Sequence, residues 1–147
     1  MSAPDPAFTV LVVCTGNICR SPLAELLGRA RLSTLLGNSG VLRLESAGTR
    51  AVVGSAMDPA SARVLQELGG NPEGFRARHL TDQLAAAADL TLTMTRDHRR
   101  DVLGRAPRAM SRTFTLREAA GLLGLLDDEA PLLDADPADR ARGGPSQ

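Results

Sequence analysis

The first apolar segment of the chain is a short run rich in β-branched residues. Residues 8–13 read FTVLVV, with hardly a polar position between the apolar ones, which is typical of a strand buried on both faces of a sheet. After a polar loop, Pro22 suits the first turn of a helix, and leucines and alanines then recur at helical spacing up to Gly37. The pattern therefore predicts a buried strand, a loop and a helix in succession.

Strand and helix patterns alternate along the rest of the sequence. Residues 41–46 alternate between apolar and polar and predict a second strand. Asp58 followed by Pro59 predicts the capped start of a helix that ends at Gly69. The remaining predicted elements are helices at 81–90, 96–103 and 117–126 and strands at 90–94 and 112–116.

This alternation predicts the α/β fold class. Parallel strands joined by right-handed helical crossovers give a four-stranded parallel sheet, doubly wound, with helices on both faces. We expect one α/β domain over residues 8–126, followed by an acidic, proline-containing segment at 127–147 that forms a loop or is disordered. Ligands of such sheets bind at the carboxyl ends of the strands, and Cys14 directly follows the first strand.

Composition and charge argue against several classes of function. The 147 residues carry 17 Lys+Arg and 17 Asp+Glu, so no net field favours nucleic acid or an anionic membrane as a partner. Two cysteines cannot form a disulfide framework, and two histidines lack metal-ligand spacing, so neither a metal nor a cofactor is expected. No apolar stretch is long enough to cross a bilayer, and the N-terminus lacks the basic start of a signal peptide, so we expect a cytoplasmic protein.

The loop after the first strand has the composition of an anion-binding nest. Cys14 and Arg20 enclose the residues TGNIC, in which Gly16 and Asn17 enter positive φ at low cost. Inward-pointing amides of such a loop, together with the N-terminus of the following helix, form a site for a tetrahedral oxyanion such as phosphate. The predicted phosphate-binding residues are Thr15, Gly16, Asn17, Ile18, Cys19, Arg20 and Ser21.

The same surroundings predict a chemical role for Cys14. Backbone amides, a helix N-terminus and the Arg20 guanidinium all stabilise a thiolate, and Arg20 can also contact two phosphate oxygens at once. Ser21 can donate a further hydrogen bond to the thiolate. A thiolate beneath a bound phosphoryl group predicts attack at phosphorus, a cysteinyl-phosphate intermediate and its hydrolysis. The alternative is that Cys14 is an inert, buried cysteine at the end of a strand.

The stretch CTGNICRSP at residues 14–22 resembles the signature C-x-G-N-x-C-R-S-P of the low-molecular-weight protein tyrosine phosphatases. Further similarity lies in SAGT (46–49), GFRARHLT (74–81), DLTLTM (89–94) and FTLREAA (114–120), so the resemblance covers roughly residues 9–123. It implies a cysteine-dependent phosphomonoester hydrolase that acts on phosphorylated protein and releases inorganic phosphate. By position, Cys14 would be the nucleophile and Arg20 the phosphate clamp.

The resemblance also implies roles for the residues around this pair. Asn17 would be held in a strained turn, Ser21 would donate to the thiolate, and Ser46 would brace Asn17 from the neighbouring strand. Ser46 has the alternative of capping its own backbone. Cys19 would pair reversibly with Cys14 under oxidation and so protect the nucleophile, or it would simply face the core.

The general acid of the family is an aspartate in an Asp-Pro loop. Residues 136–137 form the only Asp-Pro pair in the C-terminal part, so Asp136 is the candidate acid and Asp134 the second choice. The following residues, ADRARGGPSQ, contain neither the aromatic side chains nor the closing helix usual in the family. Asp136 is therefore either the acid or a solvated residue of an acidic tail.

The sequence leaves the substrate open. Phosphotyrosine is the default substrate, although the chain has no Tyr or Trp to stack on an aryl ring, and phosphoarginine is the rival because arginine phosphatases of the family share Thr15. Two other possibilities are an arsenate reductase resolved by an external thiol and a phosphate-binding module that has lost its acid. His79 and His98 have no evident partner, and we predict that both are surface residues.

Overall fold

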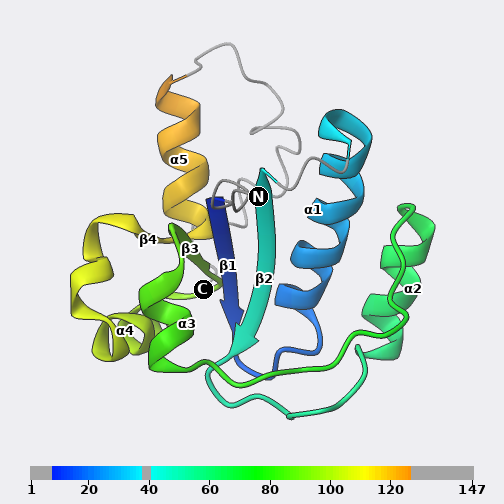
Figure 1. Ribbon diagram of the computed structural model, residues 1–147, viewed down its shortest axis with the longest axis horizontal. Coiled ribbons are helices and arrows are strands. Elements are labelled where there is room, and N and C mark those ends of the chain that lie inside the picture. Colours follow the sequence, from blue (N-terminus) through cyan, green and yellow to red (C-terminus); the bar gives the residue numbers. More distant parts are fainter. Residues whose placement is uncertain (1–7, 38–40, 127–147) are drawn as a thin grey trace, which may run out of the picture.

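The computed structural model describes residues 8–37 and 41–126 (Figure 1). Within these ranges the strands are β1 (Phe8–Cys14), β2 (Leu42–Gly48), β3 (Leu90–Thr93) and β4 (Thr113–Thr115). The helices are α1 (Arg20–Leu36), α2 (Pro59–Glu67), α3 (Asp82–Ala87), α4 (Arg96–Arg105) and α5 (Leu116–Leu126), and a 3-10 helix, η1 (Pro107–Arg112), precedes β4. All four strands pair in parallel in the order β2-β1-β3-β4. The predicted α/β fold with a four-stranded parallel sheet is therefore confirmed.

The strand order places a switch point at β1. The chain leaves β1 for β2 on one side of the sheet and then crosses back to β3 on the other side. Crossovers of the usual right hand place α1 on one face of the sheet, and α3 and α4 on the opposite face. In Figure 1, α1 lies beside β2 with α2 outside it, and α3 and α4 lie together on the other side. The carboxyl end of β1 thus opens where ligands of such sheets bind.

The central strand β1 is buried on both faces. Leu11 and Val13 belong to a core cluster that includes Ala85 of α3 and Val102 of α4. Val10 and Val12, which alternate with them along the strand, are also buried and face the opposite side of the sheet. This double burial explains the unbroken apolar run in the sequence and holds the end of the strand, where the loop begins, in a fixed position.

Several helix ends follow from local sequence. The Asp58 side chain accepts a hydrogen bond from the amide of Ser61 and caps α2, as predicted, and Pro59 occupies its first position. Gly37 follows α1 with a φ of 69°, which agrees with the predicted end of that helix. None of the helices in the described part of the chain has both the length and the apolar character needed to cross a membrane.

Candidate active site

The loop between β1 and α1, together with the residues at its two ends (14–21), is called the phosphate loop below. Its carbonyl groups face a second segment, residues 49–58, which donates a series of backbone hydrogen bonds to them. These run from Thr49 N to Cys14 O (2.9 Å), Arg50 N to Thr15 O (2.9 Å), Val52 N to Gly16 O (3.0 Å) and Asp58 N to Ile18 O (2.8 Å). No acceptor within the described residues takes the amides of residues 16–19. The loop therefore has four of its carbonyls satisfied by this segment and its amides available to an anion.

Asn17 holds the turn of this loop. It has a φ of 58° and its side chain is completely buried. Its Nδ2 group donates to the hydroxyls of Ser21 and Ser46, both at 2.9 Å, and its Oδ1 accepts from the amide of Arg78 at 2.8 Å. An asparagine tolerates this left-handed conformation, and here its side chain also links three separate segments, which a glycine in the same turn would not do.

Gly48 lets the end of β2 come close to the phosphate loop. A Cβ atom at this position would lie 2.3 Å from the carbonyl oxygen of Thr15 and 3.0 Å from the amide nitrogen of Asn17. Its φ lies outside the left-handed region, so space alone requires a glycine here. The sequence stretch SAGT therefore contributes this close approach as well as the serine.

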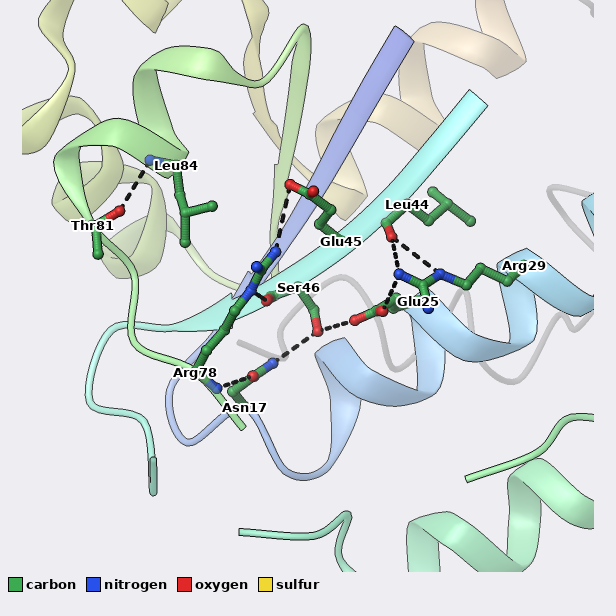
Figure 2. Close-up of polar contacts among 9 residues, drawn as sticks. All are labelled: Asn17, Glu25, Arg29, Leu44, Glu45, Ser46, Arg78, Thr81 and Leu84. Atoms are coloured by element: carbon green, nitrogen blue, oxygen red, sulfur yellow. Dashed lines mark hydrogen bonds and ion pairs between the residues drawn. The ribbon is translucent and has the colours of Figure 1, made fainter. Parts of the chain in front are cut away.

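A chain of polar contacts leads from Asn17 through Ser46 and Glu25 to Arg29 on α1 (Figure 2). The Ser46 hydroxyl accepts from Asn17 and donates to the Glu25 carboxylate at 2.5 Å. Glu25 is nearly inaccessible and forms an ion pair with Arg29 at 2.8 Å, and Arg29 also donates to the carbonyl of Leu44. Because every member of this chain has a partner, the burial of the carboxylate is compensated and Ser46 has one preferred orientation.

The Cys14 thiol lies at the base of the phosphate loop. Its Sγ is 2.8 Å from the Ser21 hydroxyl, and the side chains of both residues are buried. The Ser21 oxygen already accepts from Asn17, which leaves its own proton free for the sulfur. Arg20 is exposed at the first position of α1 and has no carboxylate partner in the described structure. The buried sulfur therefore lies near the N-terminus of α1, within hydrogen-bond distance of a hydroxyl that can donate to it.

Of the two predicted surface histidines, His98 is buried. Only 5% of it is exposed, and its Nε2 lies 2.8 Å from the Thr15 hydroxyl. Its Nδ1 accepts from the backbone amide of Thr95, and the Thr95 hydroxyl accepts from the His98 amide in return. The surface prediction for His98 is wrong because both ring nitrogens find partners in the fold, whereas His79 is exposed as predicted.

The remaining predicted site residues fall into two groups. Cys19 is partly buried and, like Cys14, is a free thiol, so the predicted reversible pairing stays a prediction. Asp136 and Asp134 lie outside the described residues, and so does the whole 127–147 segment. Among the residues that are described, no group of His, Cys, Asp and Glu side chains is placed to hold a metal ion.

A pocket of about 340 Å³ adjoins the polar chain rather than the sulfur. It is lined by α1, β2 and residues 73–78, among them Glu25, Ser46 and Arg78, and by none of the residues of the phosphate loop. The Arg78 side chain donates to the carbonyl of Ser46 at 2.9 Å and lies 3.4 Å from the carboxylate of Glu45. The chemistry that the loop predicts is therefore located outside this pocket, with Ser46 at the boundary between the two.

Fold and site together define an α/β protein with an oxyanion-binding loop built around a cysteine. Residues 9–126 match the family model of the low molecular weight phosphotyrosine protein phosphatases. The chain is 40% identical over 106 residues to the low molecular weight protein-tyrosine-phosphatase Etp of Escherichia coli K12, an alignment that covers 72% of this chain and 67% of Etp. The chain thus belongs to the low molecular weight phosphotyrosine protein phosphatase family, whose named members are hydrolases.

Solved structures show the same relationship. A low molecular weight protein tyrosine phosphatase from T. tengcongensis superposes with a TM-score of 0.71 at 34% identity, over 78% of this chain and 77% of that one. The YwlE arginine phosphatase from Geobacillus stearothermophilus superposes with a TM-score of 0.66 at 34% identity, over 77% and 69%. This chain thus spans about two thirds to three quarters of the length of these relatives. The family match does not favour the arsenate reductase alternative.

Proposed function

We propose that the chain hydrolyses phosphomonoesters through a cysteinyl-phosphate formed on Cys14. The observation that carries this proposal is the position of the Cys14 sulfur, 2.8 Å from the Ser21 hydroxyl, at the base of a loop whose amides have no acceptor among the described residues. Ser21 and the N-terminus of α1 stabilise the thiolate, which is the nucleophilic form of cysteine. The phosphoryl group moves to sulfur as the leaving oxygen departs, and water then attacks phosphorus and releases inorganic phosphate and the thiolate.

The loop amides and Arg20 stabilise the charge that develops on the phosphoryl oxygens. Amides held in place before the substrate arrives need no reorganisation during the reaction, and this is the main source of catalysis by oxyanion sites. The four backbone hydrogen bonds from segment 49–58 keep the loop in this arrangement. Arg20, which is exposed and unpaired in the described structure, adds a planar pair of donors.

An aryl leaving group needs a proton, because its conjugate acid has a pKa of about 10. Asp136 remains the proposed donor, with Asp134 as the second choice, on the Asp-Pro sequence alone. A phosphorylated protein is the proposed substrate class. Relatives named as tyrosine phosphatases support phosphotyrosine, and the YwlE arginine phosphatase supports phosphoarginine as the rival.

Trapping the intermediate tests the nucleophile directly. The wild-type protein is mixed with an aryl phosphate, quenched in acid and analysed by tandem mass spectrometry. We expect a phosphoryl group on Cys14 and none on Cys19, which serves as the control within the same peptide. Cys14→Ser should lose turnover while it still binds inorganic phosphate, because the main-chain amides of the phosphate loop bind the anion and are unchanged. Turnover retained by Cys14→Ser would contradict the proposal.

The dependence of rate on leaving group tests the acid. Steady-state rates are measured on aryl phosphates whose leaving groups span several pKa units, for the wild type and for Asp136→Asn and Asp134→Asn. If Asp136 delivers the proton, the wild-type rate depends weakly on leaving-group pKa and Asp136→Asn makes the dependence steep. A steep dependence in the wild type would mean that no proton is delivered, and the phosphate-binding module with a lost acid would then be the better description.

A further inference from the structure

Among the described residues, His98 is the buried titratable side chain that contacts the phosphate loop and takes no part in the proposed reaction. It is the third residue of α4, and its ring bridges that helix to Thr15, which is 83 residues away in the sequence. Thr15 is exposed at the rim of the loop, directly after the nucleophile. The ring therefore connects the first turn of α4 to a hydroxyl on the exposed side of the loop.

The contacts determine which ring nitrogen carries the proton. The amide of Thr95 donates to Nδ1 at 3.2 Å, so Nδ1 must be unprotonated. In the neutral ring the proton then resides on Nε2, which donates to the Thr15 oxygen at 2.8 Å. Since that oxygen accepts from the ring, the hydroxyl proton of Thr15 is turned away from His98 and is free to be donated elsewhere.

We propose that His98 is a positioning residue that orients the Thr15 hydroxyl as a hydrogen-bond donor toward the oxygens of a bound phosphoryl group. The inference rests on the proposed function for its effect on turnover, although its geometry can be tested without any turnover. Two contacts hold the ring, one from the main chain of Thr95 and one to Thr15, so the imidazole has a single orientation in which both are satisfied.

This arrangement depends on a neutral ring. A charged imidazolium carries a proton on both nitrogens, and its Nδ1–H would then face the N–H of Thr95, donor against donor. Burial and the nearby Arg20 lower the pKa of His98 below its usual value of 6.5, while Asp97 and Asp101 on the same helix act in the opposite direction. The orientation of Thr15 should consequently hold at neutral pH and be lost as the pH falls through the lowered pKa.

Variants separate positioning from simple structural support. His98→Ala removes the donor, whereas His98→Gln supplies an amide NH2 for Thr15, and glutamine is also the usual side chain at this place of a capping box. We expect kcat/KM for an aryl phosphate to fall about fivefold in His98→Ala, as for one net hydrogen bond, and to recover at least half of that loss in His98→Gln. His79→Ala, at the exposed histidine, is the matched control.

A double-mutant cycle with Thr15→Val tests whether the effect passes through Thr15. If it does, Thr15→Val combined with His98→Ala should lose no more activity than the worse of the two single variants. As the pH falls through the lowered pKa of His98, the wild type should also lose kcat/KM relative to His98→Gln, which does not titrate there. Additive losses, or equal losses in His98→Gln and His98→Ala, would overturn the proposal.

NMR tests the geometry independently of catalysis. With two histidines in the chain, long-range proton–nitrogen spectra assign both rings, and His79 again serves as reference. We expect a neutral His98 ring with its proton on Nε2 at pH 7.5, and an Nε2 signal that shifts in Thr15→Val. A charged ring at that pH, or a proton on Nδ1, would refute the inference even in an active enzyme. If the NMR result holds while no phosphomonoester is hydrolysed, the proposed function fails and the geometry stands.

Discussion

Gly48→Ala should damage the phosphate loop through a single added methyl group. The new Cβ would lie 2.3 Å from the carbonyl oxygen of Thr15, whereas ordinary contacts begin near 3.5 Å, so the loop or β2 must move by about 1 Å. The two atoms nearest to it, Thr15 O and Asn17 N, belong to the main chain and cannot rotate away. A misplacement of this size costs on the order of 100-fold in rate, and overpacking costs about 1–3 kcal/mol of stability.

The assay for this variant combines kcat/KM on an aryl phosphate, inhibition by inorganic phosphate and urea unfolding. Gly104→Ala is the matched control. It adds the same methyl group at an exposed position of α4, where nothing lies within 4 Å of the new Cβ, and should stabilise the fold by about 0.5–1 kcal/mol. Phosphate inhibition should weaken together with turnover, because both use the same loop amides. A Gly48→Ala variant within about threefold of the wild-type rate would refute the reasoning, since a displacement near 1 Å cannot leave the amides of the phosphate loop in place.

Three further predictions concern buried polar groups. Thr91→Val should raise the free energy of unfolding in urea by about 1 kcal/mol, because the Thr91 hydroxyl is buried without a partner in the described structure; a loss of stability would show that it has one. Asn17→Ala and Asn17→Gly both lose the three hydrogen bonds of the asparagine side chain, but only alanine keeps a Cβ at a φ of 58°. The glycine variant should therefore be about 1 kcal/mol more stable in thermal melts, and equal melting temperatures would contradict this. The pKa of His98 is lowered in the folded state, so the unfolded chain binds more protons than the folded one once the pH falls below about 6.5. The wild type should therefore lose stability relative to His98→Gln between that pH and the folded pKa. Curves of unfolding free energy against pH that run parallel for the two proteins would rule this out.

The phosphate loop and the fold around it could be predicted from sequence because their signals are local. The apolar run of β1, the Gly-Asn pair and the start of α1 lie within fifteen residues, and each has a characteristic composition. The order of strands and helices then follows from their alternation. The nearness of Cys14 and Cys19 could also be predicted without long-range contacts, because both belong to one short loop.

The interactions that hold the loop could not be predicted, because their partners are far apart in sequence. Thr15 and His98 are separated by 83 residues, and the Asn17 side chain meets the amide of Arg78 across 61. The role of Gly48 appears only when β2 lies beside the loop. A weak signal existed for His98: it stands three residues after Thr95, at the spacing of a capping box, with histidine where glutamate or glutamine is usual.

The bonds between the phosphate loop and segment 49–58 use main-chain atoms only. The shape of the loop is therefore independent of which side chains the segment carries. Side chains in that segment, such as Val52 and Val53, are exposed at 49% and 68% and take no part in the bonds that support the loop. Substitutions there can therefore change the surface beside the phosphate loop while the loop keeps its main-chain support. Among descendants of this chain, that surface can diverge while the shape of the loop is preserved.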